Sequence, residues 1–296
     1  MADAKERLDA QDDGLKKSSR LRETAKWLLR RKLSVVGLVI FVLYILIAIF
    51  APYLSPYDYA GLDLSHMNEA PSSKYLLGTD NFGRDILTRL LYGTRYSLAL
   101  GLGAASMGVA FGVILGCLAG FFGKWVEEII MRFCDLMQAI PGTMLAVVIS
   151  MVLGTGFGNT IIAVGIGRIP LNCRLLRAQF LSQRKLEYVE AAQATNCSKL
   201  RQMFVQILPN TVAPLIVNGT MGVGAAIMIA AGLSFINLGV QPPTPEWGAM
   251  ITAAKEFIRQ YPYQTIYPGL FMAVFVLALN LLGDGLRDAM DPKLKI

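Results

Sequence analysis

Long stretches without charge recur along this chain and indicate its class. No Asp, Glu, Lys or Arg occurs in 33–57, 96–123, 136–167, 202–245 or 260–283. Each stretch can cross the hydrocarbon core of a bilayer, which takes about 20 helical residues. A buried helix of a soluble protein would explain one such stretch, but not five in 296 residues. The pattern therefore predicts an all-α integral membrane protein.

The stretch 136–167 is too long for one span, and Gly154, Gly156, Gly158 and Asn159 interrupt it in the middle. Because glycine weakens a helix, we expect two helices here. The complete pattern then predicts six transmembrane helices, at 33–54, 97–122, 133–153, 158–175, 211–236 and 267–286.

The basic residues orient these six helices. With the N-terminus inside, the inner segments carry 21 of the 28 Lys and Arg residues, and the outer segments carry six. A single span over 136–167 would place the six basic residues of 174–209 outside, against the positive-inside rule. We therefore expect a multi-pass protein of the cell membrane with both termini in the cytoplasm.

This topology divides the chain into five regions. We expect a cytoplasmic N-terminal segment (1–32), a first transmembrane helix (33–54) and an extracytoplasmic loop with an interfacial helix (55–94). A core of five spans (95–286) and a cytoplasmic tail (287–296) follow. Within the core, 174–209 is expected to be a cytoplasmic loop and 237–266 an outer loop.

The composition of the chain argues against several kinds of binding and catalysis. The chain is 54% hydrophobic, and its net charge of +7 comes from basic residues that flank apolar spans, so we expect no nucleic-acid partner. His66 is the only histidine and the four cysteines lack metal-ligand spacing, so we expect no catalytic residue and no metal. Gly123-Lys124-Trp125 is the nearest approach to a phosphate-binding loop, but it lacks the upstream glycine and the Ser/Thr. The chain alone is therefore not expected to hydrolyse ATP.

The predicted cytoplasmic loop 174–209 is helical by composition. Asn196 interrupts it, and Ser198 can cap a second helix that runs to Pro209. Two short helices joined by a tight turn would project from the membrane. Ala191, Ala192 and Ala194 would give the first helix a face small enough for another protein to pack closely.

This loop resembles the coupling loop through which binding-protein-dependent ABC permeases dock onto their ATPase subunits. Asn196 stands where that family usually has glycine, and asparagine is the non-glycine residue that best tolerates a left-handed turn. Gln206 stands where histidine is common. The residues that match the motif or complete the expected coupling site are Glu187, Glu190, Ala191, Ala192, Asn196, Ser198, Ile207, Leu208 and Pro209.

Three further stretches, 77–101, 235–250 and 280–292, resemble the C-type permease of dipeptide, oligopeptide and nickel importers. The outer motif residues are Gly78, Thr79, Asp80, Gly83, Arg84, Asp85, Pro242, Pro243, Pro245, Trp247 and Gly248. The C-terminal motif residues are Asn280, Gly283, Asp284, Arg287 and Asp288.

The motif around Asp80 also has a local interpretation. Thr79 or Asp80 can cap an amphipathic helix that starts near Arg84–Asp85 and lies at the outer interface. We expect Asp80, Arg84 and Asp85 to form an ion-pair and capping network rather than a catalytic site.

The motif around Trp247 predicts another short helix. Thr244 can cap it, Pro245 fits its first position, and Glu246 suits the positive end of its dipole. Trp247 would anchor this helix at the membrane interface, and the helix would also offer a docking surface for a binding protein.

Two sites in or near spans carry charge. Asp284 and Arg287 lie three residues apart near the cytoplasmic end of the last span, where they can pair or extend towards the interface. Arg168 lies within a span, with the pore and the partner subunit as its candidate surroundings. Pro170 predicts a bend just after it.

The resemblance implies a type I importer permease without a cofactor of its own. Its expected partners are a second homologous permease, two ABC ATPase subunits that bind ATP and Mg, an extracytoplasmic substrate-binding protein and membrane lipid. Di- or oligopeptides are the favoured substrate class, while nickel, glutathione, opines and other small solutes remain alternatives. An ion-coupled secondary transporter is a rival, but apart from Arg168 the spans lack the charged residues it needs. A membrane-embedded enzyme would need clustered acids, histidines or a metal motif.

Overall fold

The computed structural model describes residues 27–290, and long helices dominate them. The ends of the predicted cytoplasmic segments, 1–26 and 291–296, lie outside the described residues. The helices are α2 (Lys32–Leu54), α3 (Ile86–Phe122), α4 (Lys124–Gln138), α5 (Gly142–Leu153), α6 (Phe157–Gln183), α7 (Glu187–Ala194), α8 (Lys199–Arg201), α9 (Leu208–Phe235), α10 (Trp247–Ala254) and α11 (Tyr263–Met290). Short 3₁₀ turns occupy Leu64–His66 and Lys255–Phe257, and a π-helical turn occupies Gln202–Ile207.

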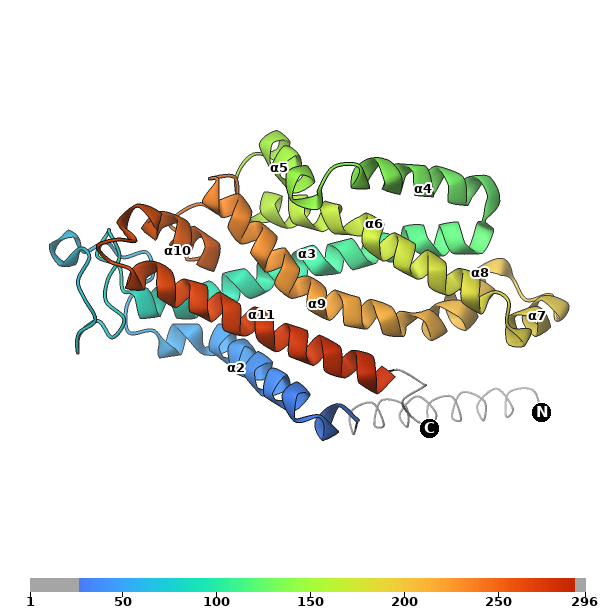
Figure 1. The fold of residues 1–296 in the computed structure, drawn as a ribbon, viewed down its shortest axis with the longest axis horizontal. Helices are drawn as coiled ribbons and strands as arrows, with labels where there is room; N and C mark the ends of the chain where they lie inside the picture. The colour runs from blue at the N-terminus through green and yellow to red at the C-terminus, as the bar shows by residue number, and fades with distance from the viewer. Residues whose placement is uncertain (1–26, 291–296) are drawn as a thin grey trace.

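The long helices run side by side as one bundle (Figure 1). α3 and α6 pack along the middle, α9 crosses them, and α2 lies against α11 on one flank. α4 and α5 cover the other flank. The α7–α8 segment projects from one end of the bundle, and α10 with the 55–85 loop closes the opposite end.

Four helices are long and apolar enough to cross a membrane: α2, α3, the continuous run Lys199–Phe235, and α11. The pair α4–α5, bent by 88°, would make a fifth span if it crosses as a broken helix. α6 carries Arg168, Arg174 and Arg177 and is not among them. The structure therefore supports an all-α membrane protein with four or five candidate spans.

The predicted continuous helix over 133–153 is wrong. The chain breaks at Ala139–Pro141, and Pro141 adopts an extended conformation with φ −52° and ψ 134° before α5 starts. Proline cannot donate a backbone hydrogen bond and disfavours helix in the residue before it, here Ile140. This explains why an apolar stretch that reads as one helix forms two.

Two predicted boundaries are also absent. The expected interfacial helix after Asp85 is the first part of α3, which runs unbroken for 37 residues. The second loop helix does not end at Pro209, because the π-helical turn leads directly into α9. In each case packing against neighbouring helices maintains a helix that the local sequence alone would interrupt.

A ridge of glycines joins α3 to α6. Gly108, Gly112, Gly116 and Gly120 recur at every fourth position, so they share one face of α3. A Cβ atom added at Gly112 would lie 2.4 Å from the Cβ of Asn172, and the other three positions would approach α6 within 2.5–2.7 Å. The two backbones therefore touch over more than three helical turns, an arrangement that only small residues permit.

We expect Gly112→Ala to destabilise the protein by about 1–3 kcal/mol, because the new methyl group overpacks the α3–α6 contact. Gly232→Ala is the matched control, since a Cβ there meets no atom within 4 Å and alanine favours helix. Thermal unfolding of the purified chain in detergent measures both. Equal thermal unfolding midpoints for the two variants would show that the glycine ridge is not a tight contact.

Candidate coupling and outer-loop sites

The 184–209 segment, called here the α7–α8 hairpin, forms the expected tight turn. Asn196 adopts a left-handed conformation with φ 55°, and the Cys197 N–H donates to the Ala192 carbonyl at 3.0 Å. Ser198 caps α8, because its Oγ accepts from the Arg201 N–H at 3.4 Å. The predicted turn and cap geometry are therefore confirmed.

One side of α7 is buried and the other is free. Val189 is fully buried and Ala192 is 6% exposed, whereas Glu187, Glu190 and Ala191 are exposed. Sequence reasoning selected Ala191 and Ala192 together, but only Ala191 lies on the accessible side. Asn196 and Ser198 are exposed at the turn.

The buried side of α7 anchors the hairpin to the bundle. Val189 packs in a base cluster made by Cys117, Leu176, Phe180, Val189, Met203, Ile207 and Leu215, which come from α3, α6, α7, the π-helical turn and α9. Through this cluster α7 is packed against three long helices, α3, α6 and α9. Val189 is not among the residues predicted from the sequence, although an apolar residue between two glutamates on a short helix was the available signal.

The π-helical turn explains how the chain passes Pro209. The Leu208 N–H donates to the Met203 carbonyl, five residues back, and the exposed Pro209 follows at the start of α9. Pro209 itself donates no backbone hydrogen bond, and proline is tolerated in the first turn of a helix. Ile207 is fully buried in the base cluster, while Leu208 is half-buried.

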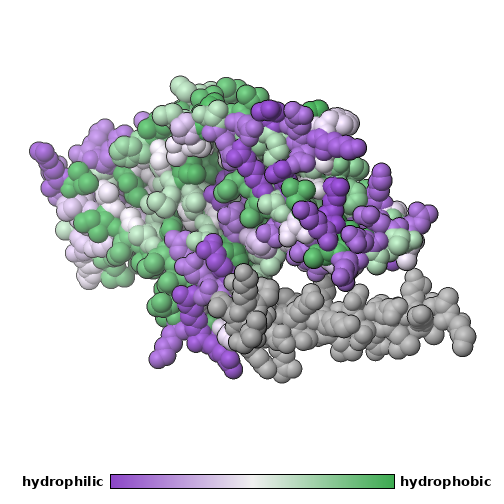
Figure 2. All heavy atoms as spheres, turned by 45° about the vertical axis from the view of Figure 1, so that its right-hand side comes forward, coloured by the Kyte–Doolittle hydropathy of each residue, from purple (hydrophilic) through white to green (hydrophobic). Residues whose placement is uncertain are grey.

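The free surface at this end mixes charged and apolar side chains (Figure 2). Leu186, Leu200, Phe204 and Val205 are exposed by 44–63%. Large apolar side chains of this kind, interspersed with charge, are typical of a protein-docking surface.

At the opposite end, Asp80 organises the outer loop. Its carboxylate accepts from the Phe82 N–H at 2.9 Å, the Arg84 N–H at 3.0 Å and the Arg84 Nε at 2.7 Å. Arg89 lies 3.6 Å away, and both arginines are almost fully buried. The expected ion-pair network is confirmed.

The predicted cap of the following helix was wrong. Asp85 caps α3 by accepting from the Thr88 N–H at 2.7 Å, whereas Thr79 bonds within the loop to His66 and Glu69. Asp80 is not the cap because its oxygens are already occupied by Phe82 and Arg84. Gly83 is required here, since its φ is 75° and an added Cβ would lie 1.7 Å from the Asp63 carbonyl oxygen.

Glu246 is the hub of the second outer motif. The structure corrects the predicted helix start, because Glu246 rather than Thr244 caps α10 and Pro245 lies outside the helix. Its carboxylate, 1% exposed, accepts from the Gly248 and Ala249 N–H groups at 2.9 and 2.8 Å. Burial raises the pKa of the Glu246 carboxyl, while these donors favour its charged form.

Two serines extend the Glu246 network to the long helices. Ser97 of α3 donates at 3.4 Å and Ser234 of α9 at 3.3 Å. One carboxylate therefore connects α3, α9 and α10, a role that the dipole argument from sequence did not predict.

Trp247 is not an interfacial anchor, because it is fully buried in the bundle. It contacts Tyr44 and Phe275 edge-on, with ring centroids 5.9 Å apart in each pair. Gly248 permits this insertion, since an added Cβ would lie 2.4 Å from the Cα of Ala231 on α9. The adjoining Pro242 and Pro243 precede it in the loop, and the Pro243 carbonyl accepts from Arg89 at 3.4 Å.

The C-terminal motif lies on α11. Gly283 is buried where an added Cβ would lie 2.5 Å from the Met221 side chain, and Asn280 is half-buried. In residues 27–290 the predicted Asp284–Arg287 pair does not form; Asp288 pairs with Arg31 instead. That pair connects α11 to the residue before α2.

Comparison with known proteins decides the family. Residues 112–296, more than half of the chain, match the family described as binding-protein-dependent transport system inner membrane component. Residues 19–71 match the N-terminal transmembrane domain of oligopeptide transport permease C. The chain belongs to this permease family, as a C-type member. The family resemblance predicted from the motifs is confirmed.

Relatives of this permease are similar over nearly their whole length. The dipeptide transport permease DppC of Alkalihalophilus pseudofirmus is 44% identical over 274 residues, covering 93% of this chain and 90% of that protein. The glutathione transport permease GsiD of Pectobacterium atrosepticum is 44% identical over 275 residues, covering 93% and 91%. The di/tripeptide permease DppC of Pseudomonas aeruginosa is 42% identical over 292 residues, covering 97% and 96%.

A solved structure supports the fold of this permease. A chain of the MetNI methionine ABC transporter in an inward-facing conformation matches with a TM-score of 0.57 and 16% identity, covering 70% of this chain and 98% of that one. The permease is thus a multi-pass inner membrane component of an ABC transport system, not its catalytic subunit. Membership in a binding-protein-dependent system implies ATPase and binding-protein partners.

We expect Glu246→Gln to lower the free energy of unfolding by about 1–3 kcal/mol. Gly248 and Ala249 donate to different carboxylate oxygens, so an amide leaves at least one buried N–H without an acceptor. Glu256→Gln is the matched control, because Glu256 is exposed in the same loop. Thermal unfolding compares the two, and equal stability of both variants would contradict the role of the hub.

Proposed function

We propose that this permease forms half of the membrane channel of an ATP-driven importer of di- or oligopeptides. A second homologous permease supplies the other half, two ATPase subunits supply the energy, and an extracytoplasmic binding protein delivers the peptide. The observation that carries this proposal is the anchoring of the exposed α7 face, through Val189, to the base cluster of the bundle. In this arrangement a protein bound to the exposed face of α7, outside the membrane, can move α7 and with it the helices of the base cluster.

The substrate class is inferred from the relatives. Proteins named for dipeptide, di/tripeptide and glutathione transport share 42–44% identity with this chain over nearly its full length. Their cargoes are all short peptides or peptide-like molecules. A peptide is therefore favoured over nickel or another small solute.

In this proposal α7 is the ATPase-docking element. Glu187, Glu190 and Ala191 present its free face, Asn196 and Ser198 fix the turn, and Ile207, Leu208 and Pro209 connect it to α9. When the ATPases close, the α7–α8 hairpin moves as one body, and the base cluster transmits this movement to α3, α6 and α9.

The proposed topology has six spans, counting α4–α5 as one broken span and including α6, with both termini in the cytoplasm. The basic residues of the α7–α8 hairpin support this orientation. The outer motifs around Asp80 and Trp247 then lie on the extracytoplasmic side, where the surface beside α10 is proposed to receive the binding protein.

Cysteine labelling tests this orientation without any mutation. Cys197 in the α7–α8 hairpin is partly exposed, whereas the other three cysteines are buried. We expect a membrane-impermeant maleimide to label the native chain in inside-out vesicles and not in right-side-out ones. Cys197→Ser, which should remove the signal, is the control. Labelling in right-side-out vesicles would place the hairpin outside and refute the proposal.

We expect Ala191→Trp to reduce dipeptide uptake by the reconstituted importer by about tenfold or more, because an indole on the exposed face blocks close packing of the ATPase. Co-purification of the ATPase subunits should fall in parallel. The control is Ala70→Trp, since Ala70 is exposed at the opposite end of the molecule. Undiminished ATPase binding by the Ala191 variant would exclude this face as the docking element.

A further inference from the structure

Arg168 is a cation within α6 whose side chain has no partner in residues 27–290. Only its backbone carbonyl takes part in a side-chain hydrogen bond, accepting from Asn172 Nδ2 at 3.1 Å. None of the ion pairs among the described residues includes its guanidinium. The side chain is partly buried among the helices of a membrane protein, where an unpaired charge is costly, so an anion from outside these helices is expected to pair with it.

Two glycines make room for this side chain. A Cβ added at Gly108 of α3 would lie 2.7 Å from the Arg168 Cβ, and one added at Gly222 of α9 would lie 2.5 Å from its Nη2. The guanidinium therefore lies in the seam between α6 and α9, where it packs directly against the backbone of α9 at Gly222. Nearby, the α4–α5 break approaches α6 at Gly167, where an added Cβ would be 3.6 Å from the Gly142 carbonyl oxygen.

Beyond Arg168, polar side chains continue along the seam between α6 and α9. One turn after Arg168, the fully buried Asn172 accepts from Asn218 Nδ2 of α9 at 2.7 Å. Asn218 lines a cavity of about 330 Å³ whose other polar wall residue is Arg287. Neither Asp284 nor Asp288 lines this cavity, and Asp288 is paired with Arg31. The seam thus carries two guanidinium groups and no lining carboxylate among the described residues.

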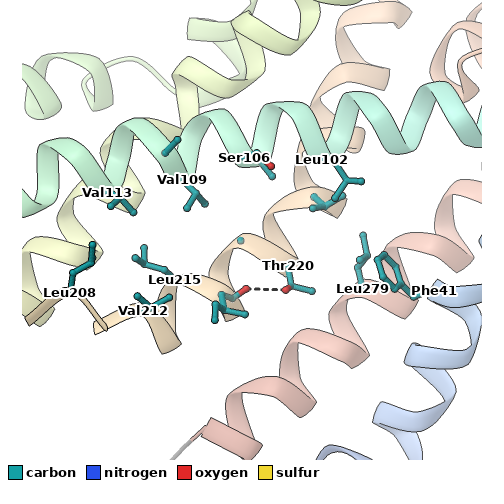
Figure 3. Close-up of a pocket in the computed structure, with 15 residues that line it drawn as sticks. Phe41, Leu102, Ser106, Val109, Val113, Leu208, Val212, Leu215, Thr220 and Leu279 are labelled. Atoms are coloured by element: carbon teal, nitrogen blue, oxygen red, sulfur yellow. Dashed lines mark hydrogen bonds between the residues drawn. The ribbon is translucent and has the colours of Figure 1, made fainter. Parts of the chain in front are cut away.

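Another face of α9 has a different character. There a groove of about 510 Å³ runs between α3 and α9 and is lined almost entirely by apolar side chains (Figure 3). Its two hydroxyls come from Ser106 and Thr220, and Thr220 is already bonded to the Ile216 carbonyl at 2.9 Å. A peptide with charged termini would lose its hydration in this groove without compensation. The α6–α9 seam is the side of α9 that can compensate a negative charge.

We propose that Arg168 binds the carboxylate of the peptide in transit. The planar guanidinium fork matches a carboxylate with two parallel hydrogen bonds, and a C-terminal carboxylate is common to short peptides. The amides of Asn172 and Asn218 lie further along the same seam, toward the cavity that Arg287 lines. This inference rests on the proposed function as a peptide importer.

The test uses the complete importer in proteoliposomes with its ATPases and loaded binding protein. We expect Arg168→Met to lower the peptide taken up per ATP hydrolysed by about tenfold, the effect of losing a charge-assisted hydrogen bond. Arg168→Lys retains the charge without the fork and should give an intermediate loss. Gly222→Ala, which displaces the guanidinium without changing charge, should also lower uptake, while Gly232→Ala should not.

A second comparison addresses the carboxylate itself. Dialanine and its C-terminal amide, each preloaded on the binding protein, should be taken up at different rates by the wild-type importer and at similar rates by the Arg168→Met variant. Wild-type uptake for every Arg168 variant would overturn the inference. Loss of the second permease from the purified Arg168→Met complex would also overturn it, because the carboxylate would then belong to that subunit. Absence of peptide uptake by the wild-type importer would instead refute the proposed function.

Discussion

The close contact of α3 with α6 is the constraint on which the rest of the structure depends. Four glycines at every fourth position let the two backbones touch, with no side chain between them on the α3 side. In a bilayer apolar side chains gain little by leaving lipid for protein, so close packing of this kind is what holds helices together. The other long helices, and the segments at both ends of the bundle, are positioned relative to this pair.

Both ends of this helix pair carry a specialised cluster. At one end Cys117 of α3 and Phe180 of α6 belong to the base cluster that holds α7 through Val189. At the other end Ser97 of α3 donates to Glu246, which also holds α10 and α9. The α7–α8 hairpin and the outer loop are therefore joined through one packed core, as the proposed transmission of movement between the two ends requires.

The polar groups of the bundle differ in the number of hydrogen-bond and ion-pair partners that they have. Those in the outer loop, such as Asp80 and Glu246, have several hydrogen-bond partners each, as burial requires. Within the spans, Asn218 donates to Asn172. Arg168 is a cation inside α6 whose side chain pairs with no described residue, and this unpaired charge points to a ligand.

The sequence by itself determined the class of protein, the tight turn at Asn196 and the ion-pair network at Asp80, because charge placement, hydropathy and cap residues act locally. The resemblance of its motifs indicated the family. Only the tertiary structure decided that Trp247 is buried, that Glu246 joins three helices, and which face of α7 is free. Those outcomes depend on contacts between residues far apart in the chain, and neither periodicity nor propensity encodes which partner a side chain will meet.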